Sequence, residues 1–103
     1  MKTINIKGKE YTQVHERLKY FRENPKYKGW SIDTEIIDRS DNTITMKAYV
    51  RNQDGVLIGS GTAEEEKGST YINKTSYVEN CETSAWGRAL GCIGIGLDTS
   101  VAS

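Results

Sequence analysis

The sequence predicts an α+β fold: a three-stranded antiparallel meander with helices packed on one face, preceded by a short N-terminal strand. Two helical patterns flank three consecutive strand patterns, and this order usually places the helices together on one side of the sheet. The 103 residues are enough for a single core. We therefore expect one domain over residues 1–103, without a C-terminal extension.

The N-terminal part predicts a strand followed by a helix. Residues 3–7 alternate between polar and apolar side chains, which is typical of a strand. Residues 13–24 predict a helix with Thr12 as its N-cap, while Arg17 lies off the apolar stripe. Pro25 ends this helix, because proline pushes the residue before it out of the helical conformation. The stripe consists of Val14, Leu18 and Phe21.

Three strands are predicted in the middle of the chain. They cover residues 29–38, 43–51 and 56–63, and the second has the clearest alternation. Residues 40–42 and 52–55 predict the connecting turns, where Gly55 supplies a positive φ. One face of the second strand is apolar and should point into the core. Its members are Ile44, Met46, Ala48 and Val50.

A second helix is predicted from Ser76 to about Leu90. Ser76 and Glu79 have the spacing of a capping box, in which the two side chains satisfy each other's backbone amides. Its narrow face of small residues allows close contact with a sheet. Glycines follow at the helix end and should break it up. The face consists of Val78, Cys81, Ala85 and Ala89.

The two cysteines and the hydropathy pattern predict a cytoplasmic protein. Cys81 and Cys92 are expected to be small buried hydrophobes in a reducing compartment, because a bridge between them would strain the helix. No apolar run approaches the length of about 20 residues that spans a bilayer. We expect neither membrane association nor a signal peptide.

Charge is distributed unevenly along the chain, although the formal net charge is zero. Residues 1–28 carry eight Lys and Arg against three Asp and Glu, whereas residues 29–103 carry six against eleven. Such asymmetry hints at a polyanionic partner. A solvated basic helix would explain it equally well.

Side chains that could carry catalysis are not grouped in the sequence. His15 has no neighbour that would complete a triad, and the cysteines lack metal-ligand spacing with it. Residues 64–66 are three adjacent glutamates at a strand end, and a solvated terminus explains them better than a metal site does. We therefore expect no enzyme activity, no cofactor and no metal.

A row of cationic and aromatic side chains suggests a surface for single-stranded nucleic acid. Lys47, Tyr49 and Arg51 should share one face of the second strand, where cations can meet phosphates and a flat ring can stack on a base. Lys74 and Arg88 are further candidates for this nucleic-acid-binding set. An ordinary solvent-facing strand would also show this pattern.

The C-terminal part resembles a family of known proteins. Residues 77–96 read YVENCETSAWGRALGCIGIG, and residues 44–61 read ITMKAYVRNQDGVLIGSG. The first run resembles the signature helix of phage and prophage single-strand annealing proteins related to the Rad fifty-two and Erf recombinases. The second resembles that family's middle hairpin. The resemblance implies a Rad fifty-two-like β-β-β-α core.

This resemblance also implies a function. It predicts a non-catalytic module for phage recombination that binds single-stranded DNA, or RNA, for strand annealing and that assembles into homo-oligomers. Arg88 matches a DNA-contacting basic residue of the family, whereas Gly87 and Gly91 stand where eukaryotic members have further basic residues. Two other functions stay open. One is a phage protein-interaction or host-defence-modulating module on the same fold, and the other is a small-molecule-binding or enzymatic domain.

Overall fold

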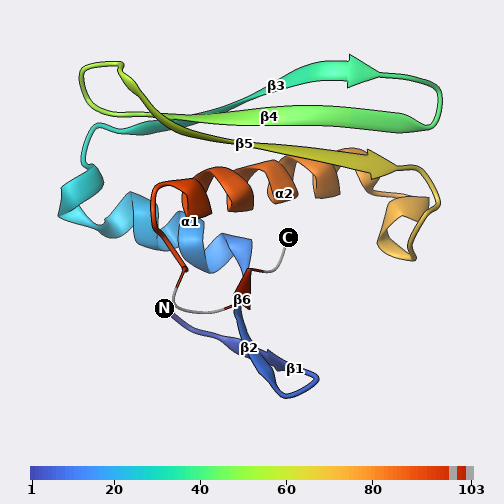
Figure 1. Cartoon of the computed structure of the whole chain (residues 1–103), viewed down its shortest axis with the longest axis horizontal. Coiled ribbons are helices and arrows are strands. Elements are labelled where there is room, and N and C mark those ends of the chain that lie inside the picture. The colour runs from blue at the N-terminus through green and yellow to red at the C-terminus, as the bar shows by residue number, and fades with distance from the viewer. Residues whose placement is uncertain (98–99, 102–103) are drawn as a thin grey trace.

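A computed structural model describes residues 1–97 and 100–101, and it confirms the predicted α+β class. Two helices cover one face of a three-stranded antiparallel sheet (Figure 1). No helix in the described part of the chain is long and apolar enough to cross a bilayer. The sheet strands are β3 (Ser31–Arg39), β4 (Thr43–Arg51) and β5 (Leu57–Glu66), and the helices are α1 (Val14–Glu23) and α2 (Tyr77–Cys92).

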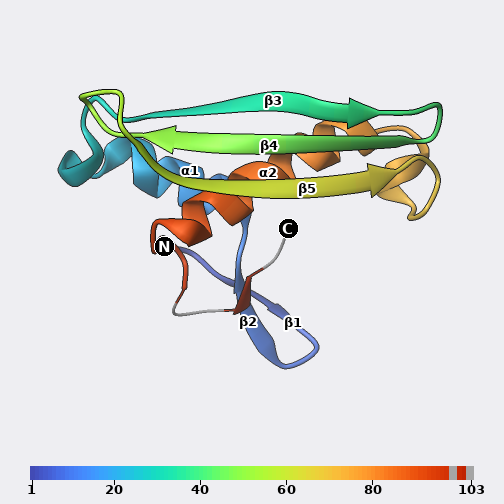
Figure 2. The ribbon, with the colours of Figure 1, turned by 45° about the horizontal axis from the view of Figure 1, so that its top comes forward.

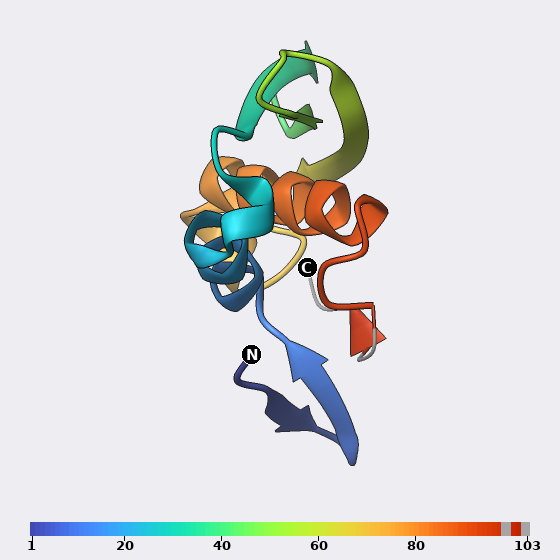
Figure 3. The same ribbon diagram turned by 90° about the vertical axis from the view of Figure 1, so that its left-hand side faces the viewer.

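A second, smaller sheet lies below the helices and contains the predicted N-terminal strand. Its order is β1 (Ile4–Ile6), β2 (Lys9–Thr12) and β6 (Ser100–Val101). Lys7 and Gly8 both have positive φ, 51° and 83°, as a tight two-residue hairpin turn requires. Strand β2 was not predicted, because Gly8 was expected to end a single strand and instead forms the turn of a hairpin. The hairpin extends away from the body of the domain (Figure 3).

Helix α1 lies close to its predicted position, but its start is different. Thr12, the predicted N-cap, belongs to β2 and is buried, and Gln13 takes the cap position without a side-chain hydrogen bond. The stop before Pro25 is confirmed, since Asn24 is extended at φ −77° and ψ 124°. The Asn24 side chain then accepts a hydrogen bond from the Lys26 amide and opens the 3-10 turn η1 (Pro25–Tyr27).

The predicted meander is confirmed in the main sheet. Along β4, buried residues alternate with partly exposed ones, and both neighbouring strands pair with it in antiparallel register. The turn over residues 52–55 has Gly55 at φ 78°, and the Asn52 side chain accepts hydrogen bonds from the amides of Asp54 and Val56. The curved sheet faces the helices along its whole length (Figure 2).

Helix α2 runs to Cys92, slightly past its predicted end. Ser76 occupies the N-cap position, but its side chain makes no capping hydrogen bond, so the predicted capping box does not form. The segment before it, predicted as a loop, contains the 3-10 turn η2 (Ile72–Lys74). The predicted face of small residues is confirmed for three members that have no exposed surface: Cys81, Ala85 and Ala89.

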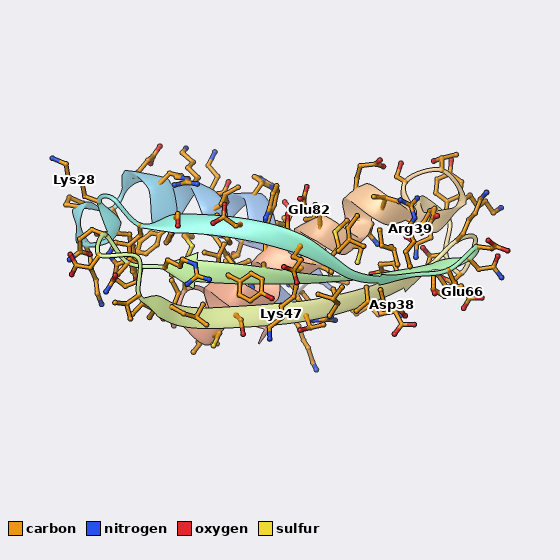
Figure 4. The ribbon with its side chains drawn as sticks, turned by 90° about the horizontal axis from the view of Figure 1, so that it is seen from above. Lys28, Asp38, Arg39, Lys47, Glu66 and Glu82 are labelled. Atoms are coloured by element: carbon orange, nitrogen blue, oxygen red, sulfur yellow. The ribbon has the colours of Figure 1, made fainter. Side chains whose placement is uncertain are left out.

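Helix α2 rests directly on the sheet because small residues meet at the contact. A Cβ atom added to Gly61 of β5 would lie 2.6 Å from the carbonyl carbon of Arg88, which no relaxed packing tolerates. On the opposite edge, the Thr34 hydroxyl donates a hydrogen bond to Glu82, which reaches from α2 towards β3 (Figure 4). The helix is therefore tied to both edge strands.

Arg17 is buried, which its position in the sequence did not predict. It lies off the apolar stripe of α1, but its side chain has no exposed surface, because α2 and the turn after it cover that side of the helix. Nη1 donates a 3.1 Å hydrogen bond to the Gly87 carbonyl, while Nε and Nη2 have no hydrogen-bond partner among the described residues. Burial lowers the pKa of the Arg17 guanidinium.

The two cysteines have different surroundings. Cys81 is buried as predicted, and burial raises the pKa of its thiol. The prediction that Cys92 is buried is wrong, because this last residue of α2 is exposed near Gly59 at the β5 edge. Both thiols are free.

Replacing Gly61 with alanine should destabilise the domain. The added methyl group pushes against helix backbone, so we expect the free energy of unfolding to fall by at least about 2 kcal/mol. Gly91→Ala is the matched control, because its Cβ would meet only ordinary contacts at 3.9 Å. In that helical position alanine should be neutral or stabilising by up to about 1 kcal/mol. Urea unfolding of both variants measures the difference, and equal midpoints would contradict the close approach of α2.

Replacing Arg17 with methionine should leave the domain as stable as before or more stable. The change removes two buried donors without partners, each of which costs about 1–3 kcal/mol, and keeps most of the side-chain volume. Arg17→Ala should lower the free energy of unfolding, because it leaves a cavity. Thermal unfolding of both variants measures the difference. An equal fall in melting temperature for Arg17→Met and Arg17→Ala would show that the guanidinium stabilises the domain by more than filling space.

Candidate nucleic-acid interface

Three predicted site residues lie side by side on the outer face of the sheet, which is the face away from the helices. Lys47 Nζ lies 5.5 Å from the Tyr49 ring centroid, and Arg51 Cζ lies 5.9 Å from it. Their common side follows from the alternation of β4, whose other side chains are buried. The row has the predicted geometry, and its role in binding stays a prediction.

Carboxylates surround this row. Asp33 lies opposite Tyr49 and Glu35 lies opposite Lys47 in the strand register, and the Tyr49 hydroxyl donates a 3.5 Å hydrogen bond to Glu35. Figure 4 looks down on this outer face and labels Lys47, Asp38 and Glu66. Five carboxylates share this face: two lie directly opposite the row and three lie further along the sheet, and their combined field opposes phosphate binding. These carboxylates are Asp33, Glu35, Asp38, Glu64 and Glu66.

The other two predicted site residues lie elsewhere. Lys74 belongs to η2, where its Nζ is 6.0 Å from the ring centroid of the exposed Tyr71. Arg88 extends from α2 to the β5 edge and donates a 2.8 Å hydrogen bond to the Thr62 carbonyl. The five predicted residues therefore do not form one surface.

Gly87 and Gly91 face α1 rather than a groove between helix and sheet. A Cβ atom at Gly87 would lie 2.7 Å from a Val14 methyl group, and one at Gly91 would lie 3.9 Å from Arg17 Nη1. A basic side chain at either position would meet a packed helix or a buried guanidinium. Packing thus explains the glycines that depart from the pattern of the annealing proteins.

A different surface gathers most of the exposed Lys and Arg side chains of the described residues. We call it the basic face, and it comprises the exposed side chains of residues 1–28 on the N-terminal hairpin, α1 and η1. Seven Lys and Arg stand there against three glutamates. These elements lie on the opposite side of the molecule from the outer sheet face (Figures 1 and 3). The cations are Lys2, Lys7, Lys9, Lys19, Arg22, Lys26 and Lys28.

The hairpin and α1 form one continuous part of the basic face. Met1 and Lys2 line a shallow depression together with Lys19 and Tyr20 of α1, and Glu16 and Glu23 line it as well. Arg22 Cζ lies 5.3 Å from the Phe21 ring centroid, and Lys26 Nζ lies 5.6 Å from that of Tyr27. Within the described residues, the one ion pair that forms on this face joins His15 to Glu16 at 3.5 Å. Its Lys and Arg side chains are therefore available to phosphates.

The signal for this face in the sequence is the charge asymmetry of residues 1–28. The clear alternation of β4 points instead to the outer sheet face. Only packing shows that Arg17 is removed from the charged surface while Lys19 and Arg22 remain exposed. The charge asymmetry of residues 1–28 therefore corresponds to a basic surface of the folded domain.

Two helices on one face of a sheet, in the order α-β-β-β-α and with a separate basic face, define a small two-layer binding domain. The chain belongs to the family described as Slr1353 N-terminal dsRNA-binding domain-like, which matches residues 18–93. No curated protein and no solved structure gives a significant match.

This family membership shows that the resemblance to the Rad fifty-two and Erf annealing proteins is wrong. The matched residues include the 77–96 run, so that run belongs to a different family. Its small residues serve packing, since Ala85 and Ala89 are buried and Gly87 contacts α1. Strand annealing, phage recombination and self-association were implied by the resemblance alone and lose that support.

Proposed function

We propose that this domain binds double-stranded RNA through its basic face and does so without catalysis. The observation that carries the proposal is the family match over residues 18–93, whose description compares the family to dsRNA-binding domains. The separate basic face supplies the surface that a polyanion needs. The proposed role is therefore recognition of an RNA duplex rather than of a small molecule.

The side chains of the basic face suit recognition by shape. Double-stranded RNA is read mostly through phosphates and 2′-hydroxyls, because side chains cannot enter its narrow major groove. Lys19 and Lys26 are long, exposed cations that can follow a phosphate backbone without reading bases. We therefore expect little dependence on RNA sequence and a strong dependence on salt.

Binding of single strands through the outer sheet face is the competing outcome. That mode needs rings for stacking, which Tyr49 could provide, and cations for phosphates, which Lys47 and Arg51 could provide. The five carboxylates on the same face weaken it. A comparison of the two faces in one experiment separates the two interfaces.

Neutralising two cations of the basic face should weaken duplex binding. We expect the Lys19→Gln, Lys26→Gln double variant to lose roughly tenfold in affinity and to reduce the salt slope by about two, one for each phosphate contact. The matched control is Lys47→Gln, Arg51→Gln, which removes the same charge from the outer sheet face and should change affinity less than twofold. Fluorescence anisotropy with a labelled RNA duplex over a salt series measures both.

Two results would contradict the proposal. Loss of binding in the Lys47, Arg51 variant with none in the Lys19, Lys26 variant would move the interface to the outer sheet face. Tighter binding of single-stranded RNA than of its duplex would show that the duplex is not the preferred ligand. Urea unfolding of both variants checks that neither change alters the fold.

A further inference from the structure

A hollow of about 490 Å³ opens where the chain leaves α1 and turns through η1 towards β3. This volume is in the range of sites that hold small molecules or single nucleotides. Aromatic, cationic and hydrogen-bonding side chains all line it. The ones that matter here are Arg22, Glu23, Asn24, Tyr27, Lys28 and Trp30.

The aromatic wall of the hollow is held in place by the core. Trp30 is half-buried and lies edge-on to Tyr27, with ring centroids 5.0 Å apart and an interplanar angle of 79°. Tyr27 packs on Phe21 at 5.4 Å, and Phe21 is almost fully buried. A ring fixed in this way can stack on a base without losing conformational freedom on binding.

Two cations border the same hollow. Arg22 Nη1 donates a 3.3 Å hydrogen bond to the Trp30 carbonyl, which holds the guanidinium beside the aromatic wall. Lys28 is exposed and points outward at this end of the domain (Figure 4). Within the described residues, neither cation forms an ion pair with a carboxylate. Both can therefore neutralise a phosphate next to a stacked base.

The hollow is already formed by its backbone. Gly29 has φ 81°, and a Cβ atom there would lie 3.1 Å from the Gln53 side chain, so the turn after η1 packs against the β4–β5 turn. Asn24 is extended and accepts the hydrogen bond that starts η1. No rearrangement of these segments is needed to expose the lining residues.

We propose that this hollow binds an unpaired nucleotide next to the duplex, with the base against Trp30 and its phosphate at Arg22 and Lys28. Glu23 and Asn24 offer hydrogen bonds to the base edge. The site rests on the proposed function, because Arg22 and Lys28 belong both to the hollow and to the basic face that would hold the duplex. The ligand is thus an RNA duplex with a single-stranded extension.

The test compares a blunt RNA duplex with duplexes of the same base pairs that carry three unpaired nucleotides at the 3′ or the 5′ end. We expect one extension to raise affinity roughly tenfold, which corresponds to stacking of one base. Trp30→Leu, which keeps an apolar side chain but removes the aromatic ring, should remove the gain and leave blunt-duplex binding unchanged. Lys28→Gln, an exposed change that spares the fold, should remove part of it.

A second readout separates this site from the proposed function. In a Trp86→Phe background, Trp30 is the only tryptophan, and a single-stranded RNA tetranucleotide should quench its fluorescence. Equal affinities for blunt and extended duplexes, with no quenching, would overturn the nucleotide site while duplex binding stands. Quenching that is lost in Lys28→Gln, without any duplex binding, would support the hollow and overturn the duplex proposal. Absence of both signals would overturn both.

Discussion

The close seating of α2 is the contact on which the rest of the domain depends. On one side Gly61 lets the backbone of α2 reach β5, and on the other Gly87 lets Val14 of α1 come into close contact with α2. Helix α1 therefore lies against α2 with one side covered and the other exposed. The exposed side, joined by the N-terminal hairpin, becomes the basic face. A larger residue at either contact would move the charged surface as well as loosen the core.

Charge separation gives the two sides of the domain different roles. The outer sheet face has five carboxylates around its cation-aromatic row, while the basic face has seven cations and three glutamates. The net charge of zero is therefore the sum of an acidic side and a basic side, and the basic side suits a polyanion. Such a distribution orients an approaching duplex, because the basic face attracts phosphates and the sheet face repels them.

Sequence patterns within a segment predicted the helices and strands. Which side chains are exposed depends on contacts between residues that are distant in sequence. The alternation of β4 and the stop at Pro25 follow from neighbouring residues, and both are confirmed. The burial of Arg17 and the exposure of Cys92 depend on where α2 and its following turn lie, which no local pattern shows. The same reason explains why the surroundings of the cation-aromatic row on β4 were not predicted. Lys47, Tyr49 and Arg51 do share one face, but their acidic neighbours come from two other strands.

The resemblance of the 77–96 run to another family has a physical cause. A helix that must fit between a sheet and a second helix needs small residues on both contact sides, and Ala85, Gly87 and Ala89 fill that need here. Unrelated domains with the same packing problem can therefore share such a run. Function has to be argued from what the packing leaves exposed. In this domain that is a set of exposed cations on the N-terminal hairpin, α1 and η1, together with an aromatic hollow beside Arg22.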